Sequence, residues 1–193
     1  MAAKKRPIEK KGPTAADAPP AAVAPAIARR SWIAVLAAAL LPLAFFWPTT
    51  GYGFLLDDRV LFEKSPSLAD PGSIAEGFVK DVGALRKGGD TVGSSYYRPV
   101  FLALSTLHYQ WIGKTPAAWH RAAVVLAALI GSLACSLFLR LGWPPLLALL
   151  ASVVFSLHPS HVSSVAWASG LQELLAAFFV LLALQAAVSV QPC

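Results

Sequence analysis

The chain has little charge and almost no cysteine. Lys, Arg, Asp and Glu make up 13% of its 193 residues, about half of the roughly 25% that is typical of soluble domains. The two cysteines, Cys135 and Cys193, have no metal or redox spacing, so no disulfide framework is expected. A glycine-rich phosphate loop, a nucleophile elbow and a repeat period are also missing. Nothing in the sequence therefore indicates a nucleotide-binding ATPase or a soluble hydrolase.

Apolar residues, in contrast, are abundant. They make up 56% of the chain, and the mean hydropathy is +0.60. Most lie in runs that approach the roughly 20 residues needed to cross a bilayer as a helix. The predicted spans are residues 32–49, 122–140, 143–158 and 172–190. We therefore expect an all-α fold, a polytopic membrane helix bundle of about four spans, with juxtamembrane helices in a first extracytoplasmic loop at residues 50–121.

The first 30 residues are rich in Ala, Pro and Lys. Such a segment buries too little apolar surface to fold, so residues 1–30 are predicted to be a disordered basic tail and residues 31–193 the membrane domain. By the positive-inside rule, this tail is cytoplasmic. The basic residues do not alternate with aromatics on a polar face, so no nucleic-acid partner is expected. We expect an integral, multi-pass protein of a bacterial inner membrane.

The segment at residues 98–112 decides the predicted topology. It is shorter than a span and has apolar residues at helical spacing, which favours a juxtamembrane helix over a true span. With this helix on the membrane surface, His158 and His161 lie on the same side as Asp57 and Asp58, and Glu173 opens the last span there. If residues 99–112 crossed the membrane instead, the histidines would lie on the opposite side.

The acidic residues are concentrated in one loop. Seven of the ten lie between residues 51 and 95, and only Glu173 follows them. Asp57 and Asp58 come directly after an apolar stretch, where a partly desolvated carboxylate is a better base or metal ligand than one in water. Alternatively, the pair is hydrated and caps a helix that begins near Arg59. Glu173 is either a functional acid at the membrane edge or an acid favoured by the helix dipole.

Two further groups are candidates for binding. Arg98, with Tyr97 beside it, is suited to clamp a phosphate, or else belongs to an aromatic belt that contacts lipid headgroups. His158 and His161 are three residues apart, a spacing that suits metal ligands if a carboxylate from elsewhere joins them. Contacts to an acceptor or a hydrogen-bonding role are the alternatives. The sequence identifies no metal; a divalent ion is the cofactor that these residues suit.

The order of these motifs resembles a known family. The motifs are residues 54–59 (FLLDDR), 97–100 (YRPV), Gly113 and Pro116 ahead of His120, residues 158–161 (HPSH) and residues 165–170 (VAWASG). Together they look like the N-terminal part of the polytopic lipid-linked-sugar glycosyltransferases. More closely, they are similar to the transmembrane O-mannosyltransferases with tetratricopeptide repeats and their bacterial relatives. The resemblance covers about residues 32–190.

The resemblance implies a hexosyltransferase that takes a sugar from a polyprenyl-phosphate carrier and passes it to a hydroxyl of a protein or a lipid-linked acceptor. It further implies that Asp57 or Asp58 is the catalytic base or a metal ligand, that Glu173 is the acid entering a later span, and that Arg98 stabilises the leaving phosphate. The partners implied are membrane lipid, the lipid-linked sugar and its acceptor. Other membrane subunits would complete the groove for the carrier.

Two features depart from the family pattern. The family has Gly-Arg ahead of the later acid, whereas here Gly170 is followed by Leu171 and Gln172. Family chains also continue through many more spans, so this chain is expected to be an N-terminal part. A non-catalytic membrane scaffold or a truncated inactive paralogue is therefore the alternative to an enzyme. A transporter fragment is disfavoured, because no predicted span has a charged residue at its centre.

The predicted topology can be tested by labelling introduced cysteines. In a chain with Cys135→Ala and Cys193→Ser, Ser160→Cys is expected to react with an impermeant maleimide from outside the cell, and Gly142→Cys only from the cytoplasm. Labelling of both from the same side, or in the reverse order, would overturn the arrangement.

Overall fold

The computed structural model describes residues 29–56, 58–63, 65–79 and 97–190. The regular structure in these ranges is helical, and they contain no strand. Almost all of the predicted tail lies outside them, as does Asp57. In chain order the elements are α1 (Arg29–Phe46), η2 (Trp47–Gly51), η3 (Arg59–Glu63), α2 (Pro66–Ala69), α3 (Ser73–Glu76), α4 (Pro99–Trp111), α5 (Pro116–Arg140), α6 (Pro145–Ser156), η4 (Pro159–His161), α7 (Val162–Ala166), η5 (Ala168–Gly170) and α8 (Leu171–Val190).

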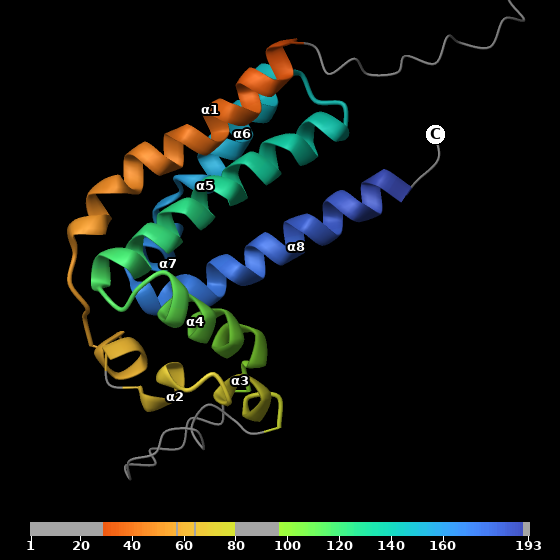
Figure 1. Ribbon diagram of the computed structural model, residues 1–193. Helices are drawn as coiled ribbons and strands as arrows, with labels where there is room; N and C mark the ends of the chain where they lie inside the picture. The colour runs from red at the N-terminus through yellow and green to blue at the C-terminus, as the bar shows by residue number, and fades with distance from the viewer. Residues whose placement is uncertain (1–28, 57, 64, 80–96, 191–193) are drawn as a thin grey trace, which may run out of the picture.

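The long helices form a bundle around α5. Helices α1, α6 and α8 each pack against α5 (Figure 1). Three helical stretches are long and apolar enough to cross a membrane: Ser31–Gly51, Pro116–Arg140 and Ala168–Ser189. They coincide with the first, second and last of the predicted spans. The described part of the chain is therefore compatible with a multi-pass membrane protein.

The remaining predicted span, at residues 143–158, takes a different form. Helix α6 has only 12 residues, which is too short to cross a bilayer. Pro159 has no backbone N–H and does not continue the helix. The chain resumes after a bend of 48° as the stretch Pro159–Ala166. The described residues thus contain three helices of spanning length, or four spans if this bent pair counts as one.

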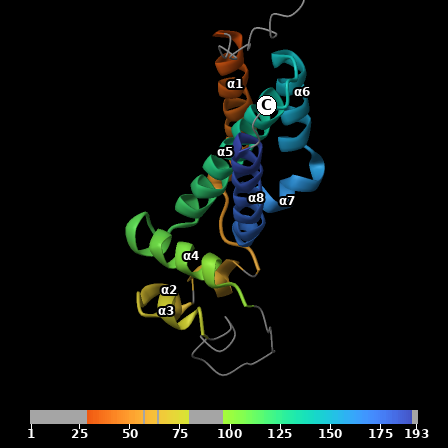
Figure 2. The same cartoon turned by 90° about the vertical axis from the view of Figure 1, so that its right-hand side faces the viewer.

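A layer of short helices lies beyond one end of the bundle. Figure 2 shows α2, α3 and α4 past the ends of α5 and α8. Helix α4 has 13 residues and is not among the stretches long enough to span; its place at a membrane surface stays a prediction. The segment after α1 and the turn before α8 lie at this same end (Figure 1). Most of the candidate residues are therefore gathered on one side of the bundle.

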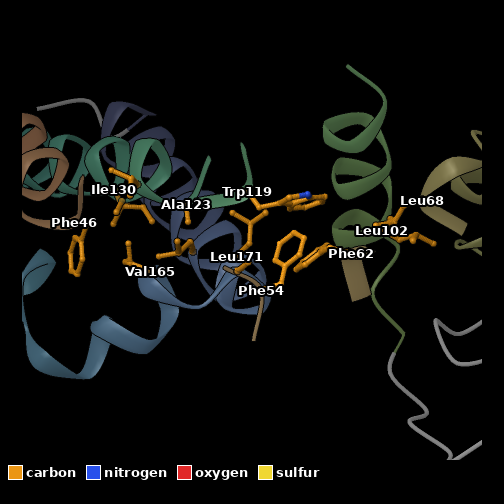
Figure 3. Packing of buried hydrophobic residues seen from close by; sticks show 14 residues of the cluster. Phe46, Phe54, Phe62, Leu68, Leu102, Trp119, Ala123, Ile130, Val165 and Leu171 are labelled. Carbon is orange, nitrogen blue, oxygen red and sulfur yellow. The ribbon is translucent and has the colours of Figure 1, made fainter. Parts of the chain in front are cut away.

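The hydrophobic core continues from the bundle into this layer (Figure 3). Trp119 is fully buried and stacks on Phe62, with 4.0 Å between the ring centroids. The centroid of the His108 ring lies 4.4 Å from that of Trp119. Burial lowers the pKa of His108, which favours the neutral ring in this packing. The layer is thus fixed to the bundle by aromatic packing.

Helix α8 packs along α5 but leaves most of its surface uncovered. Only 11% of the apolar stretch at Ala168–Ser189 is buried, against 56% for Pro116–Arg140. The Gln185 side-chain amide donates hydrogen bonds to the Leu133 carbonyl, at 3.1 Å, and to the Ser136 hydroxyl, both on α5. Amide hydrogen bonds of this kind join helices in membranes. They fix how α8 is rotated about its own axis relative to α5.

Small residues allow α1, α5 and α6 to approach closely. Ala38 on α1 and Ala148 on α6 are buried beside Cys135 of α5. At Gly131 the approach leaves no room for a side chain, because an added Cβ would lie 2.4 Å from the Ala38 carbonyl oxygen and 3.0 Å from the Ser156 hydroxyl. The three helices therefore depend on a glycine at this position.

Gly131→Ala is expected to destabilise the bundle by about 1–3 kcal/mol, since the two backbones must move apart. Gly51→Ala is the matched control, because a Cβ there meets no atom within 4 Å. The measurement is the midpoint of denaturant unfolding in detergent micelles, followed by circular dichroism. A Gly131→Ala protein as stable as the Gly51→Ala protein would contradict the described packing.

Candidate functional site

Asp58 is held inside the fold by backbone hydrogen bonds. Leu56 has a φ of +39°, and this left-handed turn reverses the chain, with the Asp58 N–H donating to the Leu55 carbonyl at 2.8 Å. The carboxylate then points inward and is 1% exposed. Its Oδ2 accepts from the Leu55 N–H at 3.3 Å, and its Oδ1 from the Ser169 N–H at 2.7 Å. Asp58 thus joins the segment after α1 to the turn before α8.

This geometry bears on the hydrated role that was the alternative for Asp58. The side chain is not hydrated, and its hydrogen bonds to described residues go to Leu55 and Ser169 rather than to the turn that begins at Arg59. Asp58 is therefore not a hydrated loop residue, and its predicted role as a catalytic base or metal ligand stays a prediction. Its neighbour Asp57 lies outside the described residues, and its predicted role stays a prediction.

A polar cavity of about 330 Å³ lies on the other side of the Ser169 turn. Its lining includes one cationic side chain, that of Arg98, one carboxylate, that of Glu173, and several serine hydroxyl groups. Its lining residues are Leu61, Arg98, Ser163, Ser164, Trp167, Ser169, Gly170, Gln172 and Glu173. The sequence placed Arg98 and Glu173 in separate motifs, and the structure brings both to this one cavity.

Arg98 reaches the start of α8 from a distant part of the chain. It directly precedes α4, and its Nη1 donates a hydrogen bond to Oε1 of Gln172, 74 residues further on. A guanidinium group therefore lies beside the residue that precedes Glu173. The resemblance expects Gly-Arg ahead of the later acid, whereas here Gly170 is followed by Leu171, and the cation beside the start of α8 comes from another element.

Glu173 is positioned by a serine and a glycine. The Ser164 hydroxyl donates to Oε2 of Glu173, and Glu173 lies in the first turn of α8, where the helix dipole favours a negative charge. Gly170 packs directly on the backbone of Ser164, because an added Cβ would lie 2.7 Å from both the Cα and the carbonyl oxygen of Ser164. The VAWASG motif thus ends in glycine because the backbone of α7 lies against it.

The other predicted residues do not join this cavity. The Tyr97 hydroxyl donates to the Phe78 carbonyl at 3.0 Å, and the ring is 60% exposed. The exposed His158 ring shares a hydrogen bond of 2.7 Å between its Nδ1 and the Ser160 hydroxyl. Its centroid lies 6.3 Å from that of His161, whose ring packs edge-on against Phe155 at 5.2 Å.

The described residues do not fit a protein-held metal ion. Among them, no three His, Cys, Asp or Glu side chains come together in a group that suits a cation. The histidine pair therefore lacks the carboxylate that the metal hypothesis requires from this part of the chain. We derive no catalytic step from a metal.

His120 belongs to one of the sequence motifs, and no role was predicted for it. It is 1% exposed, and its ring lies next to the Gly53 backbone without a hydrogen bond of good geometry to a described residue. The ring lies 6.2 Å from that of Tyr52 and is close enough to Asp58 to feel its charge. A buried imidazole with poorly formed hydrogen bonds is unusual in a folded protein, which marks His120 as a position of interest. The signal in the sequence was a histidine in the second turn of a long apolar helix.

Asp58→Asn is expected to loosen the turn before α8. The amide keeps the shape but replaces one acceptor oxygen with a donor, so either the Leu55 or the Ser169 N–H loses its partner, at a cost of about 1–3 kcal/mol. Faster hydrogen exchange of the Ser169 amide is the measurement. Asp70→Asn is the control, since the exposed Asp70 accepts only from the nearby Gly72 N–H among the described groups. Unchanged exchange at Ser169 would refute the link.

Comparisons with protein-family models, curated proteins and solved structures found no match for this chain. No relative therefore assigns a fold or a function to it. The family resemblance therefore rests only on the order of the motifs. What stands independently is a helical chain with three or four apolar helices of membrane length and a polar cavity at one end of them.

Proposed function

We propose that this chain is an integral membrane glycosyltransferase, or the N-terminal part of one, that transfers a sugar from a polyprenyl-phosphate carrier to an acceptor hydroxyl. The observation that carries the proposal is the pairing of Arg98 with the start of α8 in the polar cavity. A phosphate-linked donor needs a cation for the leaving phosphate, and arginine suits it. The resemblance expects this cation ahead of the later acid, where the sequence alone showed none.

The position of the cavity also suits a donor that lies in a membrane. The cavity lies at the N-terminal end of α8, next to the first turn of an apolar stretch of 22 residues. A lipid-linked substrate presents its phosphate at the depth where such a helix meets water. A water-soluble nucleotide sugar would not need this placement.

In the proposed reaction, a carboxylate takes the proton of the acceptor hydroxyl as general base. The acceptor oxygen forms a bond to the anomeric carbon of the sugar, and the bond between that carbon and the carrier phosphate oxygen breaks. The phosphate leaves with the electron pair as an anion, which Arg98 stabilises. Glu173 is the described carboxylate that lines the cavity. Asp57 remains a second candidate base, and Asp58 holds the wall through Ser169.

A non-catalytic scaffold is the second candidate, and one observation favours it. Both oxygens of Asp58 already accept backbone N–H groups, as expected of a residue that shapes a loop. Under this alternative the polar end of the bundle is a binding surface for other membrane subunits. It would keep its partners when Glu173 is changed.

Sugar transfer from a radiolabelled polyprenyl-phosphate donor, in membranes that contain the chain, tests the proposal. Glu173→Gln is expected to reduce transfer by roughly 10²–10⁴-fold, the usual range for loss of a general base. Arg98→Gln is expected to reduce it by at least about tenfold, through loss of a charge-assisted contact to the phosphate. Glu63→Gln, an exposed carboxylate that does not line the cavity, is the control.

Two results would contradict the proposal. Transfer that is kept in both Glu173→Gln and Arg98→Gln would place the chemistry elsewhere, and Asp57→Asn together with Asp58→Asn would then locate it. No transfer by the wild-type chain, in membranes where the protein is folded, would reject catalysis by this chain alone and favour the scaffold.

A further inference from the structure

A second cavity adjoins the polar one. It has a volume of about 200 Å³ and lies among α5, α6, α7 and α8. Its lining residues are Ala127, Ile130, Phe155, Ser156, His161, Ser164, Val165, Glu173, Leu174 and Ala177. Two of these, Ser164 and Glu173, also line the polar cavity. The hydrogen bond between them therefore stands at the boundary of the two spaces.

The second cavity suits hydrocarbon better than water. Its polar groups are few: the Ser156 and Ser164 hydroxyls, whose protons are donated to the Ser152 carbonyl at 2.7 Å and to Glu173, and the side chains of His161 and Glu173 at its edge. A water molecule needs two to four polar partners to be stable in a cavity, whereas dry cavities of about 150 Å³ bind small apolar molecules. Most of the remaining lining is aliphatic or aromatic. An apolar group of a few carbons is the occupant that this lining fits.

The position of the cavity indicates where such a group comes from. Ala127 and Ile130 belong to the apolar stretch Pro116–Arg140, and Leu174 and Ala177 to Ala168–Ser189, both of membrane-spanning length. The cavity is therefore reached among helices that contact acyl or prenyl chains when the protein is in a bilayer. The polar cavity beside it carries the arginine.

We propose that the two cavities form one binding site for an amphiphilic phosphate ester. Arg98 binds the phosphate in the polar cavity, and the apolar cavity holds the hydrocarbon segment next to it. Ser164 is a positioning residue at the passage, because its hydroxyl keeps the Glu173 carboxylate at the wall that both parts of the ligand touch. The inference deepens the proposed function by naming the lipid end of its donor, and its binding test does not require sugar transfer.

Ala177 and Ala176 offer a matched pair of variants. Ala177 lines the apolar cavity, whereas its neighbour Ala176 is exposed on α8 and lines neither cavity. Ala177→Phe fills the space intended for the hydrocarbon, and Ala176→Phe adds the same ring outside it. Arg98→Gln removes the cation and leaves the apolar cavity as it is.

The experiment measures binding to the full chain in nanodiscs with three probes: dodecyl phosphate that carries a diazirine near the phosphate, dodecanol with the same diazirine, and inorganic phosphate. Photocrosslinks of dodecyl phosphate are expected on residues that line the two cavities. Ala177→Phe is expected to weaken its binding at least about tenfold, through loss of buried apolar area, while Ala176→Phe leaves it unchanged. Arg98→Gln is expected to weaken binding of both phosphates and not of dodecanol.

Binding of inorganic phosphate shows whether Ala177→Phe fills the apolar cavity or misfolds the protein. Ala177→Phe that still binds phosphate like the wild type has an intact polar cavity, and Ala177→Val serves as the smaller variant if it does not. Equal effects of Ala177→Phe and Ala176→Phe, or crosslinks confined to the lipid-facing side of α8, would overturn the inference. Equal binding of phosphate and dodecyl phosphate would mean that a free phosphate is the ligand, and would overturn it too. Loss of sugar transfer with binding intact would instead count against the proposed function alone.

Discussion

The polar end of this protein depends on one buried carboxylate. Asp58 accepts a hydrogen bond from the Ser169 N–H, 111 residues further along the chain. This bond holds the turn Ala168–Gly170, which leads directly into α8. A charge at 1% exposure is stable only when its oxygens are hydrogen-bonded, and the two backbone N–H groups provide this. Through Gly170, which lies on the backbone of Ser164, the same link sets where Ser164 meets Glu173. The cavity wall is therefore built from the loop after α1 as much as from α8 itself.

The three long helices followed from hydropathy alone, because a run of apolar residues near 20 has few other solutions. A helix within residues 143–158 was predicted as well, but hydropathy did not show that it has only 12 residues and that the chain bends by 48° before Pro159–Ala166. Hydropathy reports only how apolar a segment is, whereas the end of α6 is set by Pro159, which has no backbone N–H to continue the helix. The helix at 99–111 was expected from its periodicity, and its short length agrees with its exclusion from the spanning helices.

The sequence predicted which residue types belong to the candidate site, but not which of them lie together in the fold. Glu173 was identified because an ionisable residue at a membrane edge is costly, and Arg98 because arginine suits a phosphate. Their common cavity depends on the Arg98–Gln172 contact over 74 residues, which no local pattern encodes. His158 was attractive because of its spacing to His161, yet its hydrogen bond goes to Ser160, two residues away. The sequence showed His120 only as a polar residue in the second turn of an apolar helix, and its burial beside Tyr52 arises only when the loop folds over α5.

The hydrogen bonds of Gln185 have a consequence at the far end of α8. This helix is mostly surrounded by lipid in a bilayer, and lipid resists neither its rotation nor its sliding. Turning α8 away from α5 would leave the Gln185 amide without the Leu133 carbonyl and the Ser136 hydroxyl, in a medium that offers no substitute donor or acceptor. The helix is rigid over the 12 residues between Gln185 and Glu173, so the direction of the glutamate is transmitted along it. An amide near the C-terminal end of α8 thus sets the orientation of the carboxylate at its N-terminal end.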